Sequence, residues 1–152
     1  MDDLVQWLRA QLDGDERAAE AASPGPWHVN AESDEVLAVD GITVADGFAL
    51  SSRQLRATTE HIARHDPARV LREIEIDREL LAEYERTLRS HEGHQRESAR
   101  LAGSGDDDVF RRNALRREAD YLPAMLHILE RWAKRKAAVY SDRPGYQESW
   151  RP

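Results

Sequence analysis

Two histidine pairs are the side chains of this sequence whose types and spacing could serve chemistry. His61 and His65 lie four residues apart, so on a helix both side chains point the same way, as the ligands of many zinc sites do. The zinc-protease pattern needs a glutamate directly after the first histidine as general base, but Ile62 stands there. The sequence therefore excludes that chemistry, and a helix end that places histidines near the negative end of the helix dipole is the simpler interpretation.

The second pair, His91 and His94, lies three residues apart in a stretch where the apolar pattern fades. Two histidines do not complete a tetrahedral zinc site, so His61, His65, His91 and His94 are only weak candidate metal ligands. We predict that the protein holds no metal.

Other motifs that commonly carry reactions are incomplete. The three aspartates at 106–108 lack the spacing of a calcium-binding loop, and a helix N-cap explains them better. The Gly-Ser-Gly at 103–105 is not followed by the Lys-Ser/Thr of a phosphate-binding loop, and no serine stands in a Gly-x-Ser-x-Gly nucleophile elbow. We therefore predict no catalytic residues, no cofactor and no enzymatic activity.

Composition bounds the class of protein. The chain has 152 residues, of which 34% are charged and 40% hydrophobic, which suits a single domain built from amphipathic helices. It contains no cysteine, which removes disulfides and thiolate chemistry, and no apolar run long enough to cross a membrane. We expect a cytoplasmic protein without membrane contact.

Charge is distributed unevenly along the chain. The formal net charge of -7 argues against broad nucleic-acid binding, since that requires a basic surface. Residues 109–140, however, hold eight basic and three acidic side chains, a local charge of +5. The basic side chains that could contact phosphate there include Arg111, Arg112, Arg116, Arg117, Lys134, Arg135 and Lys136.

The elements that must position these residues begin with a helix over 3–22 and a β-meander over 27–45. The meander is predicted from short β-branched runs at 27–31, 35–39 and 42–45, with a tight two-residue hairpin at Asp40-Gly41. A helix over 52–65 follows, whose start at Ser51 and Gln54 has the pattern of a capping box.

Asp66-Pro67 predicts a sharp boundary between two helices. Aspartate is a preferred N-cap, and proline at the first helical position gives up an amide that has no partner there anyway. A long helix over 67–101 then carries an apolar seam at alternating spacings of four and three, interrupted once by Asp77. We predict that this seam mediates self-association through Val70, Ile74, Leu81, Tyr84 and Leu88.

A last helix over 109–140, kinked at Pro123, precedes an irregular tail over 141–152 that its aromatic residues should hold in place. Its broad apolar face is expected to be core and consists of Met125, Leu126, Ile128, Leu129, Trp132 and Ala133. The predicted fold is a mainly α-helical α+β domain, with an N-terminal helix, a small antiparallel meander, long antiparallel helices and an aromatic-rich tail.

Three segments resemble a known family. The segments are residues 61–71, Gly25-Pro26-Trp27, and the ending at 140–152 with Tyr140, Tyr146 and Trp150. Together they resemble domain-of-unknown-function family 6221, a set of short actinobacterial and phage proteins. The resemblance spans nearly the whole chain and implies the same order of elements, but it brings no assigned reaction.

The chain departs from this family in one respect. The resemblance implies a cysteine-rich insert of zinc-binding type before the terminal helix, whereas this chain has no cysteine there. The resemblance therefore leaves zinc only as a possibility, and our hypothesis is that helix packing replaces a metal staple. We expect a non-catalytic interaction or assembly protein with a protein partner or a second copy; the alternative is a metal-binding or nucleic-acid-linked accessory factor of a phage or bacterial host.

Overall fold

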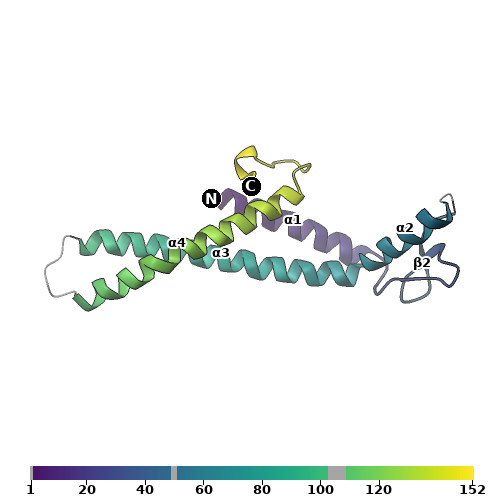
Figure 1. Cartoon of the computed structure of the whole chain (residues 1–152), viewed down its shortest axis with the longest axis horizontal. Coiled ribbons are helices and arrows are strands. Elements are labelled where there is room, and N and C mark those ends of the chain that lie inside the picture. Colours follow the sequence, from purple (N-terminus) through teal and green to yellow (C-terminus); the bar gives the residue numbers. More distant parts are fainter. Residues whose placement is uncertain (1, 49–50, 103–108) are drawn as a thin grey trace. The chain divides into compact units, whose positions relative to one another are not determined.

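The computed structural model describes residues 2–48, 51–102 and 109–152, and within them the chain has the predicted mainly helical α+β fold (Figure 1). The elements are α1 (Asp2–Ala21), β1 (His28–Val29), β2 (Glu35–Leu37), β3 (Thr43–Asp46), α2 (Ser52–Arg64), α3 (Pro67–Leu101), α4 (Val109–Val139) and the 3-10 turn η2 (Glu148–Trp150). The Gly-Ser-Gly at 103–105 and the aspartates at 106–108 lie outside the described residues, so the capping role of those aspartates stays a prediction.

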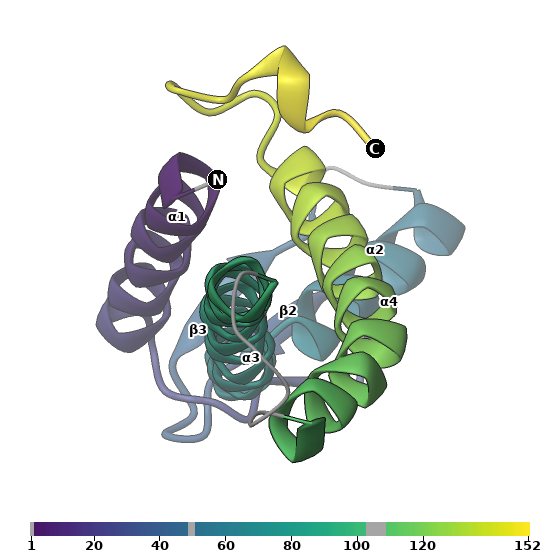
Figure 2. The same ribbon diagram turned by 90° about the vertical axis from the view of Figure 1, so that its left-hand side faces the viewer.

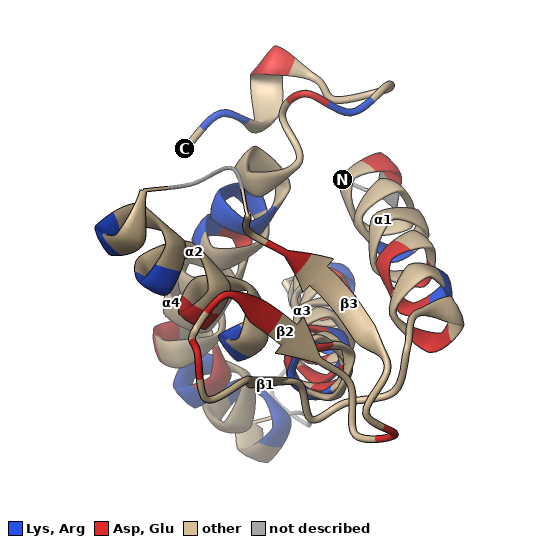
Figure 3. Ribbon diagram, turned by 90° about the vertical axis from the view of Figure 1, so that its right-hand side faces the viewer, with Lys and Arg blue, Asp and Glu red and all other residues tan. Residues whose placement is uncertain are grey.

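The chain forms two compact units, of which one comprises residues 11–77 and the other residues 1–10 with 78–152. In the first unit the three strands form an antiparallel sheet in the order β1-β2-β3, in which Val36 pairs with both Val29 and Ala45. Val36 is completely buried, whereas the flanking residues of β2 are only half-buried, as the period of two in a strand requires. Figure 3 shows α2 beside this small sheet.

The packing of α2 on the sheet depends on Thr59. Its hydroxyl oxygen lies 3.2 Å from the carbonyl oxygen of Ser33, in the turn before β2, and 2.9 Å from that of Leu55 in α2. Thr59 is buried, so its polar atom would cost free energy without such partners. A buried threonine therefore ties α2 to the turn that starts the second strand.

The connection between β2 and β3 differs from the predicted two-residue hairpin. Only Gly41 has a positive φ, at 80°, and Asp40 does not, whereas a tight hairpin of this kind needs both. The amide of Gly41 donates to the carbonyl of Ala38 and the amide of Ala38 to that of Ile42, each at 2.9 Å. The turn is therefore longer than the dipeptide suggested, and its glycine provides the left-handed residue that closes it.

The two predicted helix starts behave differently. The Asp66 carboxylate accepts a hydrogen bond from the backbone amide of Arg69 at 2.8 Å, which confirms Asp66 as the N-cap of α3. Ser51 also precedes a helix, but its side chain makes no capping bond to the backbone and instead lies 3.1 Å from the side-chain oxygen of Gln54. The predicted capping box at Ser51 is therefore wrong.

Gly25 lies against the start of α3. A Cβ atom at this position would lie 2.9 Å from the Asp66 carboxylate and 3.1 Å from the Cβ of Ala68, closer than packed side chains tolerate. The following residues, Pro26 in a cis peptide and Trp27, continue the segment, and the Trp27 indole donates to the carbonyl of Ser23 at 2.8 Å. Two of the segments that carry the family resemblance thus meet at one helix boundary.

The second unit contains the first turns of α1, the part of α3 from residue 78 onward, α4 and the tail; Figure 2 looks along α3. Arg9 and Glu85 link α1 to α3 through an ion pair of 2.9 Å, and Arg111 links α4 to Glu97 of α3 at 2.8 Å. The hydrogen bond from Arg111 lowers the pKa of Glu97. α3 continues through Gly93, and α4 continues through Pro123.

The tail is held by an aromatic cluster around Trp7. Its ring lies 6.4 Å from that of Tyr140, 5.9 Å from that of Tyr146 and 5.2 Å from that of Trp150, measured between centroids. The Trp7 indole also donates a 3.0 Å hydrogen bond to the carbonyl of Pro144. The expectation that aromatic residues hold the tail is confirmed, with the addition of Trp7 from α1 and of a short 3-10 turn.

The apolar face predicted for α4 is only partly core. Ala133 is buried and Leu126 and Leu129 are half-buried, but Met125 and Ile128 are exposed, Ile128 to 66%. The prediction that these last two residues belong to the core is therefore wrong. The helix buries a neighbouring face instead, formed by Leu115, Leu122, Ala133 and Ala137.

Candidate functional site

The first histidine pair lies at the C-terminal end of α2. The rings of His61 and His65 stand 4.3 Å apart, and His65 Nδ1 lies 2.7 Å from the carbonyl oxygen of His61. A ring nitrogen that donates to a helix carbonyl helps to satisfy the backbone at a helix end. This arrangement fits the helix-end interpretation, since the ring of His65 is bonded to the carbonyl of its own helix.

The second histidine pair lies on α3, opposite α4. His94 Nε2 is 2.8 Å from the carbonyl oxygen of Leu115, which can only accept, so this nitrogen is the donor. His91 Nε2 lies 3.0 Å from the side-chain nitrogen of Gln95, which donates to it. In the described part of the chain, no group of three or more His, Asp or Glu side chains is placed to hold a metal ion.

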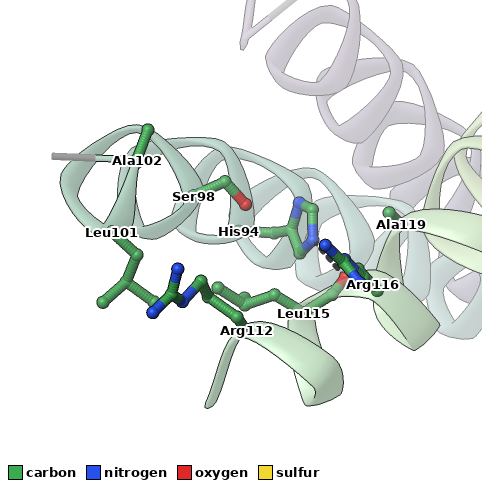
Figure 4. A pocket seen from close by; sticks show the side chains of 8 residues that line it. All are labelled: His94, Ser98, Leu101, Ala102, Arg112, Leu115, Arg116 and Ala119. Atoms are coloured by element: carbon green, nitrogen blue, oxygen red, sulfur yellow. Dashed lines mark hydrogen bonds between the residues drawn. The ribbon is translucent and has the colours of Figure 1, made fainter. Parts of the chain in front are cut away.

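A cavity of about 240 Å³ lies between α3 and α4 (Figure 4). Its lining is mainly apolar and is formed by His94, Ser98, Leu101, Ala102, Arg112, Leu115, Arg116 and Ala119. The volume is below the roughly 300 to 1,000 Å³ of sites that enclose drug-sized molecules. The hydrogen bond from His94 to the carbonyl of Leu115 crosses it and joins α3 to α4.

The predicted self-association seam on α3 lies mostly inside the chain's own core. Ile74, Leu81 and Tyr84 are buried, with Tyr84 completely so, and Val70 and Leu88 are half-buried. A helix seam that is already covered offers little apolar surface to a second copy. The alternating spacing that predicted an interface therefore positions the core of a single chain.

Tyr84 places a buried polar group in that core, and its hydroxyl has no hydrogen-bond partner among the described residues. Burial raises the pKa of Tyr84 to about 12, and the negative charge of Glu130 adds to the rise. The unfolded chain loses the Tyr84 phenol proton near pH 10, whereas the folded chain keeps it up to about pH 12. The free energy of unfolding therefore falls as the pH rises from about 10 to about 12.

We expect Tyr84→Phe to leave the free energy of unfolding at neutral pH unchanged or raise it by about 1 kcal/mol, because it removes an unpaired buried hydroxyl. Urea unfolding between pH 7 and pH 11 should show a smaller loss of stability with pH than in the parent chain. Tyr121→Phe, at a half-exposed tyrosine on α4, is the matched control and should change neither quantity. A marked loss of stability at neutral pH in Tyr84→Phe would mean that the hydroxyl has a partner after all.

The predicted basic patch does not gather on one face of α4. Arg111 is paired with Glu97, Lys134 with Glu130 at 3.0 Å, and the Lys136 ammonium lies 5.7 Å from the centre of the Tyr140 ring. Arg112 and Arg116 line the cavity between the helices. Three arginines of this helix are exposed at other positions: Arg117, Arg131 and Arg135.

The most conspicuous surface of this unit is an apolar stripe along the exposed side of α4. Its members recur at helical spacing, so they share one face, and we call it the α4 stripe: Phe110, Tyr121, Met125, Ile128, Trp132 and Val139. Phe110 is 94% exposed and Val139 68%, whereas Trp132 is half-buried. The sequence prediction missed the stripe because it assigned the exposed and the buried face of this helix to one broad core face. The spacing of residues 121, 125, 128 and 132 could have distinguished the exposed face.

No curated protein and no solved structure matches the chain. None of its described helices combines the length and the apolar character that crossing a bilayer demands. The profile of one family matches residues 1–152, which include the helix boundary at Asp66, the Gly25 segment and the Trp7 cluster described above. The chain therefore belongs to the family of unknown function DUF6221.

Proposed function

We propose that the protein is a non-catalytic interaction or assembly protein, and that the α4 stripe is the surface that meets its protein partner. The observation that carries the proposal is the exposure of large apolar side chains in line along one helix, with Ile128 at 66% and Phe110 at 94%. Contiguous exposed apolar surface on a folded domain is typical of a binding site, since each buried methylene group contributes about 0.8 kcal/mol to association.

This proposal moves the expected contact from α3 to α4. The seam at Val70 to Leu88 was the predicted surface for self-association, but its side chains mostly face the interior. The partner is expected to be a protein. We expect it in the cytoplasm, because the chain has no cysteine and no apolar run that could cross a membrane, and in a bacterial or phage-infected cell, as the family resemblance implies.

Site-specific photo-crosslinking tests the proposal. A benzophenone amino acid at position 128 in the native host should form a covalent adduct with a protein. The matched control is position 76, which also holds an exposed isoleucine, at 58%, but on α3. A protease-sensitive adduct that forms from position 128 and not from position 76 supports the proposal. The absence of an adduct at position 128, or equal amounts of adduct at both positions, contradicts it.

The same experiment tests the nucleic-acid alternative. Three exposed arginines that neither pair with Glu97 nor line the cavity are the observation that favours it: Arg117, Arg131 and Arg135. A nuclease-sensitive adduct at position 128 would favour this alternative, and its affinity should then fall steeply with salt concentration. No observation in the described residues favours the metal-binding alternative.

A further inference from the structure

We propose that the occupant of the α4 stripe is an amphipathic helix of a partner protein that carries acidic residues beside its apolar positions. This inference rests on the proposed function and names the chemistry of the partner.

The spacing of the stripe indicates a helical partner. From Tyr121 the apolar positions follow at intervals of four, three, four and seven residues, to Met125, Ile128, Trp132 and Val139. An average interval near 3.5 residues keeps a narrow seam facing a second helix over several turns. Residues 121–139 span about 27 Å at the rise of an α-helix, enough for roughly five turns of contact.

The charge beside the stripe indicates acidic side chains on that partner. Arg117, Arg131 and Arg135 are exposed, and at 100° per residue all three project along the same edge of the stripe. Arg131 also lines a depression with Arg151 of the tail, in which Glu130 is paired with Lys134 and Arg151 with Glu148, so Arg131 and Arg135 carry the positive charge at this end. Of the three acidic residues of this helix, Glu130 is thus paired with Lys134. The other two, Glu118 and Asp120, lie nearer its N-terminus. Acidic groups of the partner should therefore meet residues 131–135.

A second copy fits this surface poorly. In the helices that the structure describes, the large exposed apolar side chains belong to α4, with Ile76 of α3 as the exception. The other large exposed apolar side chains, Val39, Ile42 and Phe48, lie outside the helices. A helical contact from a second copy would thus come mainly from its own α4, which would bring a local charge of +5 against another of +5. Like charges brought together at an interface disfavour association, whereas acidic flanks would favour it.

Two synthetic helical peptides test the inference with defined probes. Both have 21 residues with leucine at the a and d positions of each heptad; one carries glutamate at e and g, the other lysine. Fluorescence anisotropy with the full chain should show at least about tenfold tighter binding of the glutamate peptide at low salt, with a smaller difference at high salt. Ile128→Asp should weaken binding at least about tenfold, whereas the matched variant Ile76→Asp should not.

A charge reversal sharpens the test. Arg131→Glu with Arg135→Glu changes two exposed side chains and should shift the preference toward the lysine peptide, while circular dichroism confirms an unchanged fold. Equal binding of both peptides, or equal losses in Ile128→Asp and Ile76→Asp, overturns the inference. Two other outcomes also overturn it. One is a chain that binds anionic phosphatidylglycerol vesicles but does not bind the glutamate peptide, and the other is a dimer of the chain that Ile128→Asp dissociates.

Failure of this inference can be told apart from failure of the proposed function. A protein adduct at position 128 without preference for the glutamate peptide leaves the proposed function standing and removes only the acidic helix. The absence of any adduct at position 128 removes both.

Discussion

Leu81→Glu should unfold the unit formed by residues 1–10 and 78–152 rather than dissociate an oligomer. Leu81 is 2% exposed, so the substitution removes a packed side chain and places a carboxylate in the core. Loss of the leucine contacts alone costs about 2 to 5 kcal/mol, and burial of an unpaired charge adds several more. A total of that size approaches the whole stability of an ordinary domain, about 5 to 15 kcal/mol. Circular dichroism and urea unfolding should show lost helix and no cooperative transition in this unit.

Two matched variants make this result interpretable. Ile76→Glu places the same charge on the same helix at a side chain that is 58% exposed, and should change the free energy of unfolding by less than about 1 kcal/mol. Leu81→Ala should keep the fold with a loss of about 3 kcal/mol. If Leu81→Glu stayed folded and light scattering showed only a change from dimer to monomer, the seam on α3 would be an interface, as its spacing first predicted.

Trp7→Ala should detach the C-terminal tail from the helices. Trp7 contacts the rings of Tyr140, Tyr146 and Trp150 and donates to the carbonyl of Pro144, so one truncation removes the centre of the cluster. We expect a loss of about 3 kcal/mol, as for other large aromatic residues replaced by alanine. Near-ultraviolet circular dichroism should lose intensity, and the amides of residues 143–151 should exchange faster with solvent.

Trp7→Phe provides the graded control. It keeps an aromatic ring in the cluster and removes the indole hydrogen bond, so it should cost about 1 kcal/mol and leave the tail protected. Unchanged exchange of the tail amides in Trp7→Ala would show that the tail is held by other contacts. Equal losses in Trp7→Phe and Trp7→Ala would assign the effect to the hydrogen bond and not to ring packing.

The residues that carry the family resemblance have structural roles in this chain. Asp66 caps α3, and Gly25 provides the space in which the preceding segment approaches that cap. Gly145 has a φ of 86° and lies so close to Trp7 that a Cβ would stand 2.9 Å from the indole nitrogen. These positions therefore specify the fold at two points, while the proposed partner surface consists of other residues, those of the α4 stripe.

The sequence by itself determined the helices, their main boundary and the class of fold. The capping preference of aspartate, the fixed φ of proline and the 3.6-residue period act within a few residues, so Asp66-Pro67 could be interpreted without the rest of the chain. The same holds for the absence of disulfides, which follows from the absence of cysteine.

Only the tertiary structure decided which apolar faces are covered. Periodicity shows that Leu81 and Tyr84 share a face, and equally that Met125 and Ile128 do, but it does not show which neighbour packs there. The fold buries the first pair and leaves the second exposed. The physical reason is that a helix seam looks the same whether its partner is another helix of the chain or of a different molecule, because both use the same spacing and the same side chains.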